Sequence, residues 1–249
     1  SDKGTQWQSL IASWVQNRPE SDSVKEALQA MFDSYVGLTL NNLKKTLKPL
    51  IPIEVMNMVQ ALLFMLEALM NDEVCSGGSA KEVQKNLEPT FVFCAVWAFG
   101  SPMAEKDGID YKKKFSEWWK SQFKAIKFPS RETVFDYFLG GDNKLDSWKQ
   151  CKEYFYTVPY DSKETVMSAV TVPTPETAAI THWMDKLVTN CHRPIMLVGS
   201  AGCGKTQLVN GLLGTLGEGM ASTGINFNYY TSAIALQNIL EGSLEKKTG

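Results

Sequence analysis

One stretch, Gly199–Thr206, constrains this chain more than any other. Its sequence, GSAGCGKT, fits the phosphate-binding pattern G-x-x-x-x-G-K-[ST] at every fixed position. The preceding segment, 194–198, is apolar enough for a buried strand, and the following segment, 207–213, can open a helix. Strand, glycine-rich loop and helix form the context in which this pattern binds phosphate. The pattern therefore predicts an α/β nucleotide-binding core in the C-terminal part of the chain.

The residue types in this stretch fit the chemistry of a nucleotide phosphate group. Glycines let backbone N–H groups turn inward and approach phosphate oxygens closely. Lys205 supplies a positive charge for the outer phosphates, and Thr206 offers a hydroxyl to Mg²⁺. We interpret Cys203 as a small residue that fills the loop rather than a nucleophile. The predicted phosphate-binding residues are Gly199, Ser200, Ala201, Gly202, Cys203, Gly204, Lys205 and Thr206.

Hydrolysis needs more than this loop. A phosphate-loop ATPase also uses an acidic residue at the end of another strand to hold Mg²⁺. The acidic residues after Thr206, among them Glu218, Glu241 and Glu245, do not follow an apolar strand. Only two strands are predicted after Val172, too few for an independent covered sheet. We therefore expect no catalytic residue and no ATP turnover in this chain alone, and the core reads as incomplete.

The N-terminal half is predicted to be helical. Apolar residues recur at helical spacing from about Thr5 to Phe128. A loop is expected at Cys75–Ser79, where glycine and serine gather. The helices are expected at 7–15, before Asn17-Arg18-Pro19; at 24–36, with Gly37 just past the end; and at 38–50, 53–70, 89–100 and 111–126.

The helix predicted at 111–126 carries aromatic and basic residues. Tyr111, Phe115, Trp118, Gln122 and Ile126 share one side, and the lysines at 113, 120, 124 and 127 share another. Such a helix can bind nucleic acid, a membrane or a partner. Because the rest of the chain has no basic excess, we favour buried aromatics beside a solvated lysine face.

A second unit begins near residue 172. Residues 140–143 are predicted to form a turn, and 145–172 an extended connector with one short strand pair. Thr174 is predicted to cap a helix that starts at Pro175 and buries apolar residues between 180 and 188. Period-two alternation at Ile225–Tyr229 predicts a second strand, and Thr231 or Ser232 can cap a final helix.

Composition excludes several classes of protein. The net charge of −2 gives no overall field that would attract nucleic acid or an anionic membrane. The most apolar segment, 61–70, is too short to span a bilayer and contains Glu67. Five scattered cysteines and two histidines suggest no metal site. Free thiols fit a reducing, cytoplasmic compartment.

Several segments, in this order and spacing, resemble dynein heavy chains, and axonemal rather than cytoplasmic ones. The resemblance covers most of the chain. The matching segments are FVFCAVWAFG at 91–100, FSEWW at 115–119, KFPS at 127–130, TVFDY at 133–137, PIMLVGSAGCGKT at 194–206, FNYYTSA at 227–233 and LEKKTG at 244–249.

This resemblance implies a place in a motor ring of AAA+ modules. Residues 1–140 would form the helical lid of the second module, 141–171 an extended connector, and 172–249 the truncated N-terminal portion of the third module's P-loop (AAA+) core. Val172, Pro173 and Thr174 would lie beside the adenine, and Thr206 would contact Mg²⁺. The site would bind ATP or ADP and would be regulatory.

The resemblance also implies partners and a cellular location. The partners would be the rest of the ring, intermediate and light dynein chains, and the microtubule through parts absent here; nucleic acid and membrane would not be partners. The location would be the cytoplasm and cytoskeleton, in the axoneme of a cilium or flagellum. Two alternatives stay open from the residues alone: a cytosolic P-loop NTPase of another class with a helical N-terminal domain, and a structural fragment that binds no nucleotide.

Overall fold

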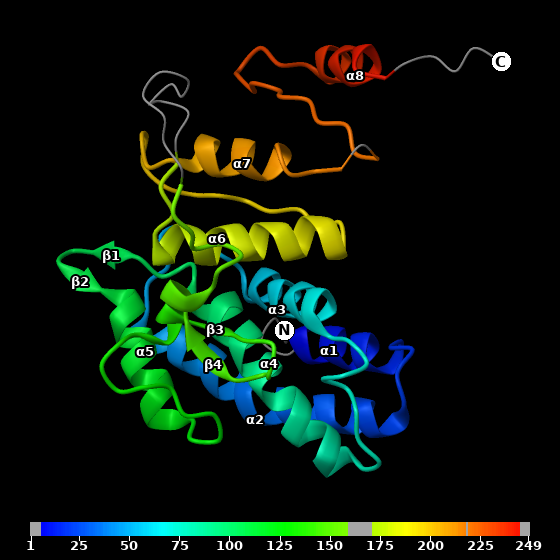
Figure 1. Cartoon of the computed structure of the whole chain (residues 1–249), viewed down its shortest axis with the longest axis vertical. Coiled ribbons are helices and arrows are strands. Elements are labelled where there is room, and N and C mark those ends of the chain that lie inside the picture. Colours follow the sequence, from blue (N-terminus) through cyan, green and yellow to red (C-terminus); the bar gives the residue numbers. More distant parts are fainter. Residues whose placement is uncertain (1–5, 159–170, 218, 245–249) are drawn as a thin grey trace. The chain divides into compact units, whose positions relative to one another are not determined.

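The computed structural model describes residues 6–158, 171–217 and 219–244. Within them the chain is mainly helical and divides into two compact units, Ser1–Val198 and Gly199–Gly249. The helices of the first unit are α1 (Gln6–Gln16), α2 (Asp22–Thr46), α3 (Val55–Leu69), α4 (Ala80–Gly100), α5 (Tyr111–Gln122) and α6 (Pro175–Asp185), with short turns η1 (Val134–Asp136), η2 (Trp148–Gln150) and η4 (Lys186–Asn190). The second unit contains α7 (Lys205–Leu213) and α8 (Ala233–Gly242) (Figure 1).

Helix α4 is the centre of the first unit. Every residue from Thr90 to Gly100 is buried, as its nearly continuous apolar sequence predicts. The helix packs against α2 and α3. Its predicted start at Pro89 is wrong, because Ser79 caps the N-terminus by accepting a hydrogen bond from the Glu82 backbone N–H at 3.4 Å. Pro89 therefore lies inside the helix.

Helix α2 is continuous where the sequence predicted two segments. Gly37 lies inside it rather than beyond its end. Glycine weakens a helix interior by only about 1 kcal/mol, and the buried residues on both sides of Gly37 outweigh that cost. Among them are Phe32, Val36 and Leu40. The predicted helix at 53–70 is confirmed as α3.

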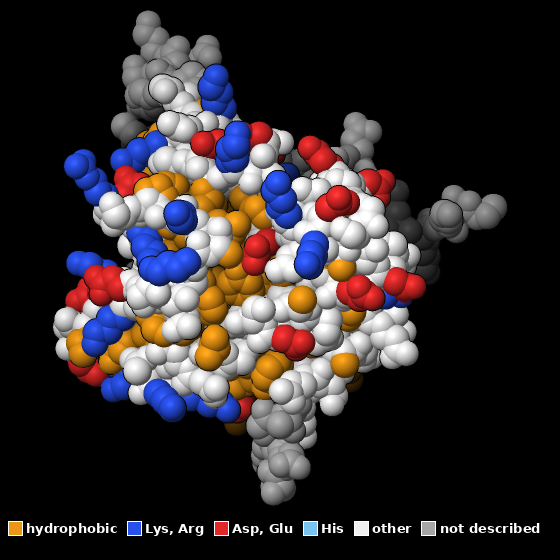
Figure 2. All heavy atoms as spheres, turned by 90° about the horizontal axis from the view of Figure 1, so that it is seen from below, with side chains coloured by type: hydrophobic (Ala, Val, Ile, Leu, Met, Phe, Trp, Pro, Cys, Tyr) orange, Lys and Arg blue, Asp and Glu red, His pale blue; other side chains and the backbone are white. Residues whose placement is uncertain are grey.

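The lysine-rich helix α5 packs into the core through its aromatic side. Tyr111, Phe115 and Trp119 are buried, whereas Gln122 is exposed. The buried stripe therefore follows Trp119 rather than the predicted Trp118 and Gln122. The interpretation as a domain helix with buried aromatics is confirmed, but the lysine face is only partly solvated. Lys113 is exposed, whereas Lys120 is half-buried and donates to the carbonyls of Pro129 and Glu132. The helix ends at Gln122, so Lys124 and Lys127 lie beyond it. On the face of the molecule seen in Figure 2, acidic side chains lie among the basic ones around a stripe of apolar side chains.

Two short antiparallel hairpins complete the first unit. Strands β1 (Glu105–Lys106) and β2 (Ile109–Asp110) pair with each other, as do β3 (Tyr137–Leu139) and β4 (Leu145–Ser147). The predicted turn at 140–143 joins β3 to β4. Trp148, directly after β4, is fully buried, and its Nε1 donates to the carbonyl of Phe135 at 2.9 Å. The predicted connector thus begins as part of the core; residues 159–170 of it lie outside the described residues.

Helix α6 belongs to the first unit. Thr174 caps it as predicted, accepting from the Thr177 N–H at 3.2 Å, and Pro175 is its first residue. Trp183 is buried and stacks on Phe93 of α4, with ring centroids 5.0 Å apart. The apolar stripe of α6 therefore packs on the helical bundle.

Neither predicted strand of the C-terminal part forms in the described residues. Segments 195–198 and 225–229 have no strand structure, and Met196 is 78% and Tyr229 96% exposed. A strand leaves its backbone N–H and C=O groups unpaired unless a neighbouring strand accepts them, and only two such segments were predicted. Ser232 caps α8, as predicted, by accepting from the Ala235 N–H at 3.2 Å.

No helix among the described residues is long and apolar enough to cross a bilayer.

Candidate functional site: the phosphate loop

The loop at Gly199–Thr206 has the backbone conformation that its glycines make possible. Gly202 and Gly204 have φ values of +78° and +85°, in the left-handed region that residues with a Cβ rarely adopt. Gly204 directly precedes the first residue of α7. The two interior glycines of the pattern therefore stand where the backbone needs them, one of them at the turn into the helix.

The N-terminus of α7 faces the loop without a side-chain cap. Gly204, at the cap position, has no side chain to accept a hydrogen bond from the first helical turn. The first N–H groups of a helix lack partners within the helix, and the helix dipole is positive at this end. An anion such as a phosphate group fits this position.

Lys205 folds back over its own loop. Its Nζ donates to the carbonyl oxygens of Gly199 at 2.9 Å and Ser200 at 2.7 Å, and lies 3.5 Å from Sγ of Cys203. The ammonium group is therefore held at the mouth of the loop by partners that phosphate oxygens could replace. The donor set fits a phosphorylated ligand: a cation, a turn with left-handed glycines and an uncapped helix N-terminus.

The remaining predicted loop residues are on the surface. Ser200, Ala201, Cys203 and Thr206 are exposed, and Thr206 lies in the first turn of α7. Among the described residues, no three acidic, cysteine or histidine side chains gather into a metal site. The structure thus places the predicted Mg²⁺ ligand on the surface at the helix start, and its role stays a prediction.

The residues predicted to lie beside the adenine belong to the other compact unit. Val172 is 68% exposed, and Pro173 leads into the cap of α6. The Thr174 hydroxyl is already used in the cap, and it also lies 3.3 Å from Oγ1 of Thr177. Contacts of Val172, Pro173 and Thr174 with a nucleotide stay a prediction.

The segment that leads toward the loop is fixed to α3 by interactions that the sequence reasoning missed. Arg193 donates to Oε2 of Glu67 from Nη2 at 2.6 Å and from Nε at 3.1 Å, and its guanidinium lies 4.3 Å from the Phe64 ring centroid. Trp14 donates to the other Glu67 oxygen at 2.8 Å. In the sequence, Glu67 stood out only as a charged residue inside an apolar segment, and this was the one available signal that its carboxylate has partners in the fold.

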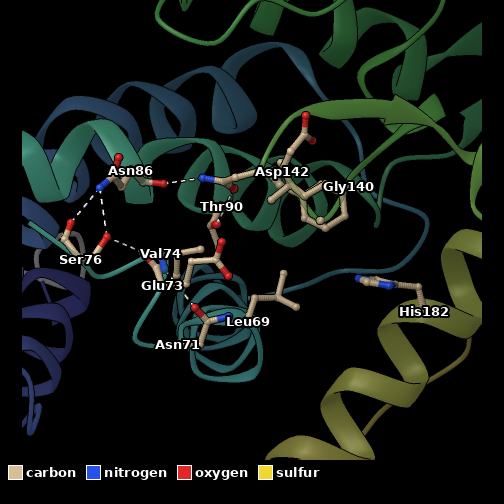
Figure 3. Close-up of a pocket in the computed structure, with 14 residues that line it drawn as sticks. Leu69, Asn71, Glu73, Val74, Ser76, Asn86, Thr90, Gly140, Asp142 and His182 are labelled. Carbon is tan, nitrogen blue, oxygen red and sulfur yellow. Dashed lines mark hydrogen bonds between the residues drawn. The ribbon is translucent and has the colours of Figure 1, made fainter.

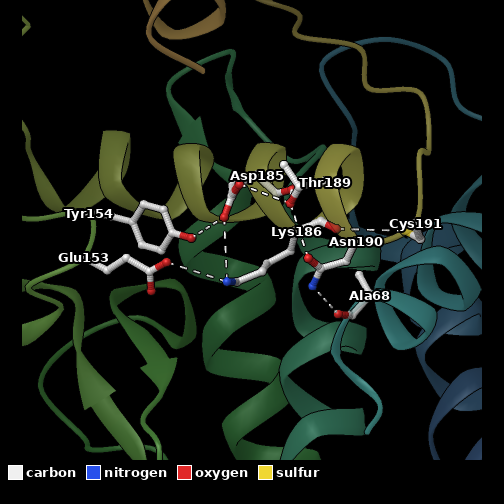
Figure 4. A network of polar contacts seen from close by, with 8 residues as sticks. All are labelled: Ala68, Glu153, Tyr154, Asp185, Lys186, Thr189, Asn190 and Cys191. Carbon is white, nitrogen blue, oxygen red and sulfur yellow. Dashed lines mark hydrogen bonds and ion pairs between the residues drawn. The ribbon is translucent and has the colours of Figure 1, made fainter. Parts of the chain in front are cut away.

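A second polar network holds the end of α6 (Figure 4). The Tyr154 hydroxyl donates to Oδ2 of Asp185 at 2.7 Å, and burial together with this carboxylate raises the pKa of Tyr154. Lys186 lies 3.7 Å from carboxylate oxygens of both Asp185 and Glu153. Asn190 donates to the carbonyl of Ala68 at 3.0 Å. Residues distant in sequence thereby tie α6 and η4 to the helical bundle.

Comparison with known proteins agrees with these features. Residues 28–153 match the family described as "Dynein heavy chain AAA lid domain", and residues 159–249 match the "P-loop containing dynein motor region". The fold class is therefore a helical lid followed by part of an AAA+ core. The predicted boundaries at residues 140 and 172 stay a prediction.

Similar proteins span the whole chain. "Dynein beta chain, ciliary" of Tripneustes gratilla is 40% identical over 250 residues, covering 100% of this chain and 5% of its own length. "Dynein alpha chain, flagellar outer arm" of Chlamydomonas reinhardtii is 36% identical, over 98% of this chain and 6% of its own length. Human "Dynein axonemal heavy chain 9" is 37% identical, over 98% of this chain and 5% of its own length. This chain thus spans about a twentieth of these relatives. It belongs to the dynein heavy chain family.

Proposed function

We propose that this chain is a nucleotide-binding junction in the motor ring of a microtubule-based dynein. Residues 1–140 would be the lid of the second AAA+ module and residues 172–249 the beginning of the third module's core. The single observation that carries nucleotide binding is the geometry of Gly199–Thr206, where left-handed glycines precede an uncapped helix and Lys205 spans the mouth of the loop.

Each loop residue has a specific part in this proposal. The Lys205 ammonium exchanges the Gly199 and Ser200 carbonyls for phosphate oxygens when ATP or ADP binds. The left-handed turn directs backbone N–H groups toward the same oxygens. Thr206 offers its hydroxyl to Mg²⁺, which balances the charge of the phosphates. Val172, Pro173 and Thr174 contact the adenine.

The site binds and regulates rather than drives turnover on its own. Residues 207–249 contain no apolar strand ending in Asp or Glu, so this chain offers no second acidic ligand for Mg²⁺. The parent motor hydrolyses ATP, and this chain alone does not. Nucleotide at this site acts as a regulatory ligand for the ring.

The names of the relatives support the proposed location and partners. They are described as ciliary, flagellar and axonemal dyneins. We therefore place this chain in the cytoskeleton of a ciliary or flagellar axoneme. Its partners are the rest of the AAA+ ring and the other dynein chains, with microtubule contact made by parts outside this chain. Nucleic acid and membrane are not partners.

Titration of labelled ATP with Mg²⁺ against the chain and against Lys205→Ala tests the proposal. Lysine removal should weaken binding by tenfold or more, because it eliminates a charge-assisted hydrogen bond to phosphate, worth roughly 1.5–3 kcal/mol. Lys246→Ala, which changes a lysine outside the loop, is the matched control and should bind like the wild type. Superimposable curves for wild type and Lys205→Ala would mean that the loop is a structural element without nucleotide.

A turnover assay tests the proposal that this chain binds ATP without hydrolysing it. Steady ATP hydrolysis by the purified chain that disappears in Lys205→Ala would refute the proposal that this chain binds without hydrolysing. We expect phosphate release to stay at the level of the buffer control.

A further inference from the structure

Two cavities of the first unit differ in the polar groups that a ligand could reach. One, of about 510 Å³, is walled by the end of α3, the loop after it, α4, the β3–β4 hairpin and α6 (Figure 3). Its wall side chains bond one another: Thr90 donates to Oδ1 of Asn143 at 3.3 Å, and Asn86 donates to the carbonyl of Ser76 at 2.8 Å. His182 is only 8% exposed, and its Nε2 is shielded from solvent. These groups are therefore not free to bind a ligand.

The other cavity, of about 270 Å³, lies at the end of α5 and beside the loop that follows it. Three lysines and three apolar residues line it, and among the described residues no acidic one does. The lining residues are Lys120, Lys124, Lys127, Phe123, Ile126 and Phe128. Because the whole chain has a net charge of −2, this local excess of positive charge is not a general property of its surface. Such a cavity favours an anion that carries an apolar group.

The apolar floor of this lysine-lined cavity is fixed by the core beneath it. Phe123 packs on the rings of Tyr35 and Trp119, with centroids 4.7 and 4.6 Å apart. Phe128 packs on the ring of Tyr137 at 6.1 Å. Both phenylalanines nevertheless stay partly exposed. The floor is therefore formed in advance, and a ligand would not have to order it.

Lys120 braces the loop that forms the far wall. Its Nζ donates to the carbonyl of Pro129 at 2.6 Å and to the carbonyl of Glu132. An ammonium group has three donors, so two of those of Lys120 are already used. We therefore assign Lys120 to the shape of the cavity rather than to the binding of a ligand.

Lys124 and Lys127 are the cations that a ligand can reach. Both residues are exposed. Nζ of Lys124 donates to the carbonyl of Lys120 at 2.6 Å, which leaves two of its three donors free. Within the described part of the chain, the Lys127 ammonium has no hydrogen-bond or ion-pair partner. Two ammonium groups with unused donors therefore border an apolar floor.

We propose that this cavity docks an acidic segment of a partner protein in which carboxylates flank an aromatic residue. The carboxylates pair with Lys124 and Lys127, and the aromatic ring packs on the apolar floor. A volume of about 270 Å³ lies below the usual range of small-molecule sites, about 300–1,000 Å³, and suits one side chain.

A peptide fits this cavity better than an extended polyanion does. The carboxylates of Glu132 and Asp136 act electrostatically on Lys120, so they lie close to the cavity. A nucleic acid or an anionic bilayer is broad enough to meet these carboxylates, which would repel it. A short peptide can avoid them. This docking site does not depend on nucleotide binding, because none of the residues that line it belongs to the phosphate loop.

Fluorescence anisotropy of a labelled acetyl-Asp-Glu-Phe-Glu-Asp-amide peptide, titrated with the 249-residue chain, tests the charge and the ring. We expect it to bind about tenfold more tightly than its amide counterpart, acetyl-Asn-Gln-Phe-Gln-Asn-amide, and to weaken as salt is added. The peptide with glycine in place of phenylalanine should bind about fivefold more weakly. Equal affinity for the acidic and amide peptides, or for the phenylalanine and glycine peptides, would overturn the proposal.

A double variant, Lys124→Gln with Lys127→Gln, tests the location. Both residues are exposed, so the variant should melt at the wild-type temperature and yet bind the acidic peptide about tenfold more weakly. Lys44→Gln with Lys45→Gln is the matched control, because it removes two exposed lysines from the last turn of α2. The control should bind the peptide like the wild type. Equal losses in the two double variants, or no loss in the first, would contradict this docking site.

Competition with other anions separates a peptide site from a general anion site. Vesicles of phosphatidylserine and phosphatidylcholine, and single-stranded oligothymidylate, should not displace the bound peptide. Displacement by either one, together with binding that is lost in the Lys124→Gln and Lys127→Gln double variant, would assign the cavity to a membrane or a nucleic acid and overturn the proposal. ATP titration is independent of all these outcomes, so failure here leaves the phosphate loop unaffected.

Discussion

The two compact units of this chain bury their apolar residues to very different degrees. In the unit Ser1–Val198, α4 is buried without interruption from Thr90 to Gly100. In the unit Gly199–Gly249, α8 has no buried residue, and Phe227 and Tyr229 are 70% and 96% exposed. The first unit therefore has a core of its own, whereas among the described residues of the second only Leu212 is buried.

This difference follows from how helices and strands satisfy their backbones. A helix pairs its own N–H and C=O groups, so caps and an apolar face are enough to place it in a bundle. A strand needs a partner strand, and the segments at 195–198 and 225–229 do not pair. The phosphate loop and α7 form because their signals are local: the glycines and the turn into the helix.

The largest expected contrast comes from deleting one aromatic side chain in each unit. Phe91→Ala removes a fully buried ring that contacts Phe32 edge-on at 5.1 Å. It should lower the free energy of unfolding by about 3–5 kcal/mol. Phe227→Ala should change it by less than about 0.5 kcal/mol. Urea unfolding followed by tryptophan fluorescence measures the difference; a similar loss in both variants would mean that the second unit has a core after all.

Acid should weaken the first unit through His182. Its folded pKa of about 3 lies below the ordinary value of 6.5, so the unfolded state binds more protons between these values. The contribution of His182 to the free energy of unfolding is complete above about pH 6.5 and is lost as the pH falls toward 3. Between pH 7 and 4 the free energy of unfolding should fall by about 1–4 kcal/mol more in the wild type than in His182→Phe. Parallel stability curves for the two proteins would contradict a buried, neutral histidine.

Two glycines give a smaller contrast. A Cβ at Gly100 would lie 2.5 Å from Cζ of Phe135 and 2.6 Å from Cε1 of Phe115. Gly100→Ala should therefore cost about 1–3 kcal/mol. At Gly211 in α7 a Cβ would meet nothing within 4 Å, so Gly211→Ala should stabilise α7 by up to about 1 kcal/mol. Chemical unfolding of the first variant and amide exchange in α7 of the second measure these effects; a neutral Gly100→Ala would show that this part of the core is loosely packed.

Much of the fold could be predicted from sequence because its signals are local. The apolar spacing of α3, the Thr174 cap of α6 and the glycine-rich loop were all visible. The start of α4 was missed because Pro89 looked like a helix start, although Ser79 already offered a cap. The packing of Trp148 and α6 onto the bundle depends on contacts between distant residues, which spacing does not show.

The same limit applies to the sites. The phosphate loop could be predicted because its residues are contiguous. Glu67 was noticed only as a charged residue that interrupts the apolar segment 61–70, because its partners Trp14 and Arg193 are 53 and 126 residues away. His182 and Glu73 line one pocket whose walls come from five elements, and no motif links them.

Hydrogen exchange measured by mass spectrometry on the intact chain tests the central contrast most directly. The account predicts slow exchange throughout 90–100 in α4, where opening requires disruption of the core. It predicts fast exchange in 233–242, because α8 buries no side chain. Protection of α8 comparable to that of α4 would contradict the claim that the unit containing the phosphate loop lacks a core of its own.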